Sequence, residues 1–263
     1  MVLSFFKKEK DFNCLLKRKT TQEKTLLWHM YQYAIGELDF QQITTCLKEN
    51  MQVLEDVFSE YGYNVINMDA TNSINESESS DEGITTTGHY EELVDVIEWT
   101  KTQEFYKEPF ALAGQSLGAI SVVRYAGQYP NKVDLLIPCA FPYYNYIEDE
   151  LNDFAKEVIK NGFCDKVSKS TGKVLRLKTA YVEDIKKLDL TEQIQKITAD
   201  TYVVVGSKDN QKHLKNSRSL YQMLNCKKEF YLLEDIPHDL ANTPHDKELF
   251  TKTLKDILIK YNN

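Results

Sequence analysis

The chain has 263 residues, of which 42% are hydrophobic, so it can bury the core of one full-sized domain. Its net charge of −8 argues against nucleic acid or an anionic lipid surface as the main partner. The five cysteines are odd in number and scattered, which predicts free thiols in a reducing compartment rather than a disulfide framework or a zinc site.

No stretch of the sequence has the length of a membrane span, and the start of the chain passes from a few apolar side chains directly to charged ones. The sequence therefore predicts a soluble, cytoplasmic protein.

Apolar runs and amphipathic segments alternate along most of the chain. Strands are expected at 25–29, 63–68, 110–113, 133–139, 201–205 and 229–233, with an edge strand around 12–16, and helices at 42–61, 90–102, 119–126, 214–224 and 250–261. A loop rich in Asn, Ser and acidic residues is expected at 71–83. Strands that alternate with helices predict an α/β fold with a doubly wound, mostly parallel sheet, and we expect a single domain over residues 1–263.

Residues 141–195 break this alternation, and we expect them to form a small helical cap inserted into the domain. A helix is expected around 151–159, then a polar stretch beyond Gly162 and two short helical pieces. An insertion at this place would lie over the carboxyl edge of the sheet, where open α/β folds bind ligands. The aromatic residues Phe141, Tyr144 and Tyr146 are therefore candidates for the wall of a substrate pocket; alternatively, they only pack the cap.

The sequence Gly114-Gln115-Ser116-Leu117-Gly118 stands between an apolar strand and an amphipathic helix. A G-x-S-x-G element at such a junction makes a sharp turn that lifts the serine clear of the sheet, and its glycines let strand and helix approach. We predict that Ser116 is a nucleophile and that the backbone N–H of Leu117 faces the oxyanion that forms. The alternative is an ordinary turn serine.

A serine hydroxyl needs a base to take its proton and a carboxylate to orient that base. Asp209 follows the strand at 201–205 and His238 follows the strand at 229–233, so both should lie at the same edge of the sheet as Ser116. We predict that His238 is the general base and Asp209 the orienting carboxylate. His245, at the start of the closing helix, is expected to cap that helix or to face solvent.

Three motifs carry a family resemblance: Gly114-Gln115-Ser116-Leu117-Gly118, Gly206-Ser207-Lys208-Asp209 and Ile236-Pro237-His238. They resemble the nucleophile, acid and histidine motifs of the α/β-hydrolase superfamily, in the branch of esterases, monoacylglycerol lipases and serine aminopeptidases with a small cap. The resemblance covers roughly residues 25–260. It implies an eight-stranded, mostly parallel sheet, hydrolysis through an acyl-enzyme, and no metal or organic cofactor.

The sequence departs from the family after the strand at 25–29. Members usually have His-Gly there, and the next residue donates the second oxyanion N–H, whereas this chain has His29-Met30. By position, Tyr31 would be that donor. We expect the Met30 side chain to turn aside and line an apolar pocket.

These observations together predict a serine hydrolase that cleaves a small or medium acyl ester, with a small-molecule acyl compound as its partner. A thioesterase or an aminopeptidase-type hydrolase with the same three residues is one alternative. A non-catalytic binding protein on the same fold is the other, and the Met30 departure favours it.

Overall fold

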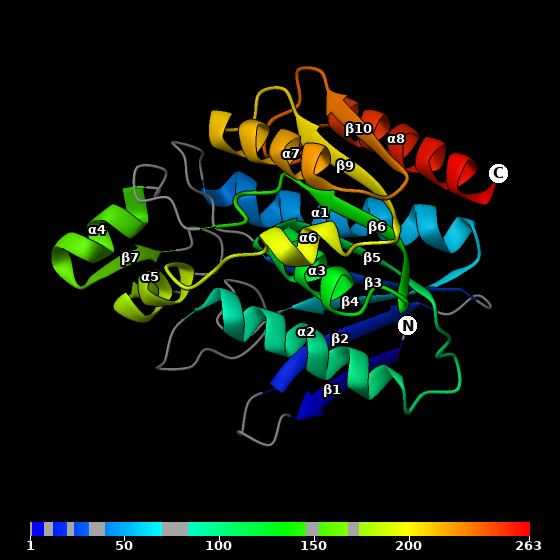
Figure 1. Ribbon diagram of the computed structural model, residues 1–263, viewed down its shortest axis with the longest axis horizontal. Coiled ribbons are helices and arrows are strands. Elements are labelled where there is room, and N and C mark those ends of the chain that lie inside the picture. Colours follow the sequence, from blue (N-terminus) through cyan, green and yellow to red (C-terminus); the bar gives the residue numbers. More distant parts are fainter. Residues whose placement is uncertain are drawn as a thin grey trace.

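The central sheet has eight strands in the described part of the chain, in the order β1-β2-β4-β3-β5-β6-β9-β10 (Figure 1). The structure is a computed structural model, and it describes residues 2–7, 13–19, 24–31, 40–69, 84–145, 153–167 and 174–263. The strands of the sheet are β1 (Val2–Lys7), β2 (Asn13–Lys19), β3 (Lys24–Tyr31), β4 (Tyr63–Asp69), β5 (Phe110–Ser116), β6 (Val133–Cys139), β9 (Asp200–Gly206) and β10 (Lys228–Leu233).

All neighbouring strands from β4 to β10 run parallel, which confirms the predicted mostly parallel sheet. The N-terminal prediction was incomplete, because the chain forms two strands there and not one. β1 and β2 pair in antiparallel fashion, and β2 continues the sheet by pairing antiparallel with β4. Antiparallel strands at the edge of a sheet tolerate the mixed apolar and charged sequence of this segment.

Helices cover both faces of the sheet and enclose a separate core on each (Figure 1). One face carries α1 (Phe40–Glu60) and α8 (Pro244–Asn262), and the other carries α2 (Thr86–Thr100), α3 (Leu117–Gln128), α6 (Thr191–Gln195) and α7 (Gln211–Met223). Alternate residues of β5 serve the two cores, because successive side chains of a strand point to opposite faces. Leu112 packs on the α3 side, whereas Ala111 and Ala113 pack on the α1 side.

The closing helix α8 begins at Pro244, so His245 lies in its first turn, as expected. Thr243 is its N-cap: the Thr243 hydroxyl accepts a hydrogen bond from the N–H of Asp246 at 3.2 Å, and the Asp246 carboxylate accepts one from the N–H of Thr243 at 3.0 Å. This capping box satisfies two N–H groups that a helix start otherwise leaves unpaired.

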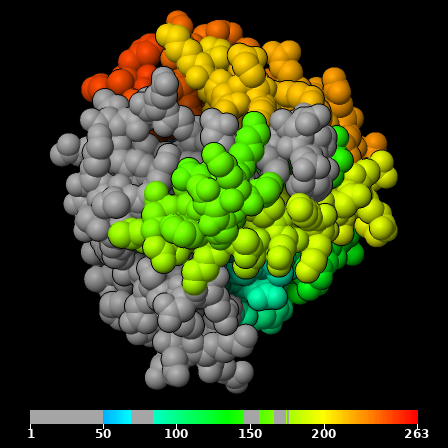
Figure 2. All heavy atoms as spheres, turned by 90° about the vertical axis from the view of Figure 1, so that its left-hand side faces the viewer, coloured from blue at the N-terminus to red at the C-terminus, as the bar shows by residue number. Residues whose placement is uncertain are grey.

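The cap segment, residues 141–195, contains α4 (Asp153–Asn161), β7 (Phe163–Val167), β8 (Val174–Lys178), α5 (Thr179–Ile185) and α6. The polar stretch expected beyond Gly162 contains an antiparallel pair of strands, β7 and β8, which the sequence did not indicate. An ion pair between Arg176 and Asp165 joins the two strands, so cross-strand charge supports the pair where apolar alternation is weak. Seen from the cap side, green and yellow-green residues of this segment occupy the centre of the molecular face (Figure 2).

Two groups of hydrogen bonds tie the cap segment to the rest of the fold. At its start, the N–H of Phe141 donates to the Ser217 hydroxyl of α7 at 3.1 Å, and the Asn216 amide donates to the carbonyl of Pro142. Near its end, Asp184 of α5 accepts from the N–H of Thr87 at 2.9 Å, at the start of α2. A carboxylate there is also favoured by the dipole of α2.

Within the described residues, no helix is both long enough and apolar enough to cross a membrane. The predicted loop at 71–83 lies outside the described residues, as does Tyr146.

Candidate active site

The predicted nucleophile stands where β5 ends and α3 begins. Ser116 has φ 55° and ψ −122°, a backbone conformation that side-chain-bearing residues rarely adopt. The turn is tight: a Cβ atom on Gly114 would lie 2.5 Å from the carbonyl oxygen of Gly118 and 2.9 Å from a methyl group of Val122. Glycine at position 114 therefore lets the helix start directly above the strand, and this geometry forces the unusual backbone of Ser116.

The two predicted oxyanion donors lie on either side of Ser116. Leu117 is the first residue of α3, so its N–H belongs to the turn whose N–H groups have no partner inside the helix. Tyr31 is the last residue of β3 and lies opposite Ser116 in the parallel register, one residue after the pair of Met30 and Gln115. The side chains of Met30 and Tyr31 are outside the described part of the structure.

The loop after β9 places Asp209 at the same edge of the sheet. This loop packs directly on the loop that carries His238: a Cβ atom on Gly206 would lie 2.2 Å from the carbonyl oxygen of Ile236. The carboxylate of Asp209 is buried, and its Oδ1 accepts the N–H of Asn210 at 2.6 Å. The absence of a side chain at position 206 thus allows the acid and the histidine to meet.

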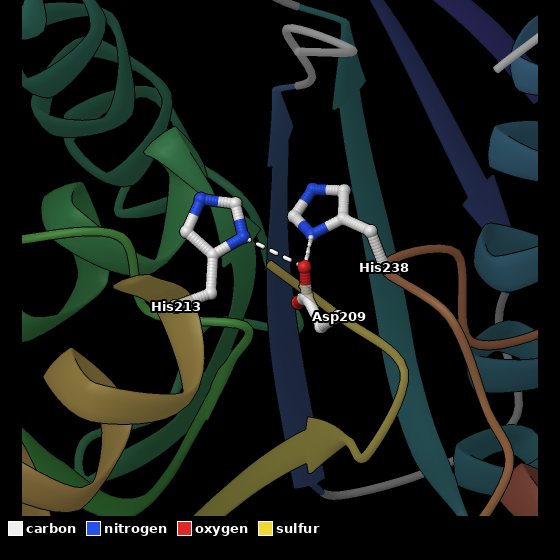
Figure 3. Close-up of side chains that lie close together, drawn as sticks. All are labelled: Asp209, His213 and His238. Carbon is white, nitrogen blue, oxygen red and sulfur yellow. Dashed lines mark hydrogen bonds and ion pairs between the residues drawn. The ribbon is translucent and has the colours of Figure 1, made fainter. Parts of the chain in front are cut away.

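His238 lies in the loop after β10 and points its Nδ1 at Asp209, 2.9 Å from Oδ2 and 3.0 Å from Oδ1 (Figure 3). Because the ionised carboxylate only accepts hydrogen bonds, Nδ1 carries the proton and Nε2 of the neutral ring holds the lone pair. Nε2 is buried and has no hydrogen-bond partner among the described residues. A neutral His238 is therefore in the tautomer that can accept a proton at Nε2.

Charges and burial oppose each other in this pair. Burial disfavours ionisation of Asp209, but the charge of His238 and the hydrogen bonds from His213 and His238 hold the pKa of Asp209 well below its usual value. Burial also disfavours the charged form of His238, yet the adjacent Asp209 carboxylate raises the pKa of His238 above that of a free imidazole. An ionised acid beside a moderately basic imidazole is the electrostatic state that general-base chemistry needs.

A second histidine, which the sequence did not reveal as part of this site, also binds Asp209. His213, in the first turn of α7, places its Nδ1 2.8 Å from Oδ1 of Asp209, and its ring lies 4.7 Å from the ring of His238 (Figure 3). The spacing of four residues between Asp209 and His213 is the one signal in the sequence that could have indicated this contact.

Asp209, His213 and His238 each offer a ligand atom, and these atoms lie within 4.8 Å of one another. Carboxylate oxygen and imidazole nitrogen are ligands that suit zinc. In the structure, both Nδ1 atoms donate to the carboxylate, so a metal ion bound at these atoms would have to displace both protons.

Gln115 is a further residue that the sequence did not single out. Its side chain is buried on the α1 side of β5, and its amide donates to the backbone carbonyl of His238 at 2.7 Å. Asn50 of α1 in turn donates to the Gln115 oxygen at 2.9 Å. The residue before Ser116 therefore connects the turn at Ser116 to the loop that holds His238.

Asp239, next to His238, is buried, and its Oδ2 has no hydrogen-bond partner in the described part of the chain. Its other oxygen accepts only a long hydrogen bond from the N–H of Ala241, at 3.5 Å. Burial, together with the nearby carboxylate of Asp246, raises the pKa of Asp239 to about 7.

Two of the predicted pocket residues, Phe141 and Tyr144, lie at the start of the cap segment; Tyr146 and the side chain of Met30 are outside the described part of the structure. Phe141 is completely buried in the core on the α3 side, so in this conformation it packs the interior and has no surface open to solvent. Tyr144 is half-buried against the same core, and its carbonyl accepts the N–H of Leu190 at 2.8 Å. His245 is exposed at the start of α8, away from Asp209 and His238.

Comparison with known proteins extends the likeness to the whole fold. No protein-family model matches the sequence, and neither does any curated protein. Among solved structures, alpha/beta hydrolase domain-containing protein 10 from mouse is 17% identical, with a TM-score of 0.70 and 99% of each chain covered. Est1E from Butyrivibrio proteoclasticus, with ferulic acid bound, is 15% identical, with a TM-score of 0.75 and 98% of each chain covered.

A third similar structure is a thioesterase domain from the curacin biosynthetic pathway, which is 14% identical with a TM-score of 0.64 and covers 98% of this chain and 99% of its own. Identities this low carry no information about substrate, but the superposition over nearly the whole length establishes the architecture. This chain has the α/β-hydrolase fold.

Proposed function

We propose that this protein is a serine hydrolase that cleaves a small or medium acyl ester through an acyl-enzyme on Ser116. The observation that carries the proposal is the strained backbone of Ser116 at the β5–α3 turn, on the same sheet edge as the hydrogen-bonded pair of Asp209 and His238. Strain of this kind persists where a side chain has to be held in a particular position. The Est1E and mouse structures support hydrolysis as the class of reaction through their fold.

In the proposed reaction, Nε2 of His238 takes the proton of the Ser116 hydroxyl as its oxygen attacks the ester carbonyl carbon. The N–H groups of Leu117 and Tyr31 stabilise the oxyanion of the tetrahedral intermediate. His238 then gives the proton to the leaving alcohol oxygen, and the acyl-enzyme remains on Ser116. A water molecule, deprotonated by His238, attacks the carbonyl carbon of this acyl-enzyme; the bond to Ser116 breaks, His238 returns the proton to the Ser116 oxygen, and the carboxylic acid leaves.

Asp209 holds His238 in the reactive tautomer throughout and stabilises its protonated form, without itself taking the proton. Nε2 of His238 has no hydrogen-bond partner among the described side chains, so the proposed proton transfer requires the Ser116 hydroxyl to come within hydrogen-bond distance of it in the substrate complex. Catalytic hydrogen bonds are often loose in the free enzyme and tighten when substrate binds.

The test is covalent labelling of the intact protein with a fluorophosphonate, which reacts with activated serines. Mass spectrometry should place the adduct on Ser116, and Ser116→Ala should abolish both the adduct and the hydrolysis of a p-nitrophenyl ester. Ser121→Ala is the matched control, because Ser121 is buried on α3 and its hydroxyl has no hydrogen-bond partner in the described residues. An adduct on another serine would refute the assignment of the nucleophile.

The leaving group is tested by comparing an ester, a thioester and an aminoacyl amide of the same acyl chain. We expect the highest kcat/KM for the ester. Labelling of Ser116 with turnover confined to the thioester or the amide would keep the mechanism and change the substrate class. No labelling and no turnover at all would instead support a binding protein on this fold.

A further inference from the structure

Asp209 is shared by two imidazoles that approach it from different elements. His213 comes from the first turn of α7 and His238 from the loop after β10, and both use Nδ1 (Figure 3). The side chains of His213 and His238 are 15% and 12% exposed, and that of Asp209 is 1% exposed. This is a buried charge with two buried donors, which is more than orientation of a single histidine requires.

Three donors hold the carboxylate. Oδ1 accepts the N–H of Asn210 at 2.6 Å and the N–H at Nδ1 of His213 at 2.8 Å, whereas Nδ1 of His238 faces both oxygens, 2.9 Å from Oδ2 and 3.0 Å from Oδ1. The terminal torsion of an aspartate is soft, so the plane of the carboxylate is set by its hydrogen bonds. His213 and Asn210, both bound to Oδ1, thus hold the plane in which the two oxygens face Nδ1 of His238.

His213 acts as a neutral donor in this arrangement. The charged groups that face it are Asp209 from the loop after β9, His238 from the loop after β10, and Lys212 on its own helix. Burial, and the positive charges of His238 and Lys212, outweigh the attraction of Asp209 and lower the pKa of His213 below that of a free imidazole. His238 can therefore become protonated during a reaction while His213 stays neutral and keeps its hydrogen bond.

We infer that His213 is a positioning residue of the proposed hydrolase, which holds the plane of the Asp209 carboxylate and, through it, the ring of His238. The inference rests on the proposed function for its effect on turnover. Its structural part, the sharing of Asp209 by two histidines, stands on the distances alone.

Two variants distinguish the contribution of the hydrogen bond from His213 to Asp209 from the contribution of the imidazole ring of His213 itself. In His213→Asn, the amide nitrogen takes nearly the place of Nδ1 and can still donate to Asp209, whereas His213→Leu has a similar length and no donor. Circular dichroism and thermal unfolding show first whether both variants fold. All measurements are made with a chelator present, so that a metal ion held by Asp209, His213 and His238 does not contribute.

On a p-nitrophenyl ester, His213→Leu should lower kcat by about ten- to a hundredfold with little change in KM, as small misplacements of catalytic groups do. His213→Asn should keep kcat within a few-fold of the unchanged protein. His213→Leu should also move the acid limb of the kcat/KM profile to higher pH, because Asp209, freed from one donor, holds the proton of His238 more strongly. Equal kcat values in the leucine variant and the unchanged protein, or equal losses in both variants, would overturn the inference.

NMR titration of His238 in the same variants does not depend on activity. A higher pKa of His238 in His213→Leu, restored by His213→Asn, is expected even if the protein turns over no ester. An unchanged pKa of His238 in His213→Leu would overturn the inference while leaving the proposed function intact. Absence of a fluorophosphonate adduct on Ser116 would refute the proposed function but not the inference that His213 positions Asp209.

Discussion

The buried carboxyl of Asp239 contributes a pH dependence of stability opposite in direction to that of an ordinary salt-bridged aspartate. Its side chain is buried, one oxygen has no partner among the described residues, and its pKa is raised to about 7. The folded protein therefore holds a proton on Asp239 at pH values where the unfolded chain has already lost it. Linkage then requires the contribution of Asp239 to the free energy of unfolding to fall as pH rises from about 4 to about 7, and this loss is complete above the folded pKa.

The magnitude follows from the two pKa values. An unfolded aspartate has a pKa of about 4, and each tenfold difference in proton affinity corresponds to about 1.4 kcal/mol. With a pKa of about 7 in the folded state, ionised Asp239 destabilises the fold by about 4 kcal/mol at pH 8. About 1.4 kcal/mol of this is already present at pH 5, so the change between pH 5 and pH 8 is about 3 kcal/mol.

Asp239→Asn removes the titration and keeps the shape of the side chain. Its new NH₂ group is buried and costs on the order of 1–3 kcal/mol if it finds no acceptor, but this cost does not vary with pH. Urea unfolding followed by circular dichroism at pH 5 and pH 8 gives the two free energies of unfolding for each protein. The stability of the variant relative to the unchanged protein should rise by about 3 kcal/mol from pH 5 to pH 8.

Asp235→Asn is the matched control, because Asp235 lies in the same loop with its side chain 77% exposed, and asparagine tolerates its φ of 62°. We expect its relative stability to be the same at both pH values. The other titrating groups, among them Asp209 and His238, are common to all three proteins and cancel in the comparison. A relative stability of Asp239→Asn that is also equal at pH 5 and pH 8 would refute the reasoning.

Three further predictions concern the proposed reaction on a small activated ester. Gln115→Met, which removes the amide that holds the carbonyl of His238, should lower kcat about tenfold with little effect on KM, and an unchanged kcat would exclude a positioning role. His238→Ala should lower kcat by at least about 10³-fold while His245→Ala stays within twofold; the reverse result would move the base to His245. Met30→Gly should leave kcat level or raise it, because Tyr31 already lies beside Ser116 in the sheet register, and a fall of about a hundredfold would mean that Met30 itself shapes the oxyanion site.

The parts of the fold and of the candidate site that could be predicted from the sequence depend on local patterns. The strand, the turn and the helix around Ser116 are contiguous, so spacing alone predicted their order and the tight approach at Gly114. Asp209 and His238 could be placed at one edge because each follows a parallel strand, and parallel strands end at the same side of a sheet.

The parts that could not be predicted are contacts between segments far apart in the sequence, which depend on the direction in which each side chain points. Gln115 meets Asn50 because it points to the α1 face of β5, and nothing near either residue indicates that pairing across 65 positions. His213 reaches Asp209 only because α7 starts at once after Asn210, which caps it by accepting the N–H of Lys212 at 2.8 Å. Recognition of that N-cap would have placed His213 in the first turn of α7. It would not have shown in which direction the ring of His213 points.

The hairpin of β7 and β8 escaped prediction for a different reason. Its residues alternate weakly in hydrophobicity, and two of its apolar side chains, Phe163 and Val174, are about half exposed. Pairing there is supported by the ion pair of Arg176 with Asp165 and by burial of the facing side chains of Cys164 and Leu177. One buried cross-strand pair is too short a pattern to indicate two strands in the sequence.

The attachments of the cap segment set the boundaries within which another cap could be grafted onto this scaffold. The backbone bridge between Asn145 and Asp189 closes the segment at its neck, and the anchors of Phe141 and Pro142 on α7 lie outside that neck. An exchange made between these two bridge residues would leave α7, with its contacts to Asp209, undisturbed. It would, however, remove Asp184, so a grafted cap has to bring its own acceptor for the first N–H groups of α2. A library of transplanted caps should therefore vary the residues inside the neck and select for a carboxylate or hydroxyl at that one point of contact.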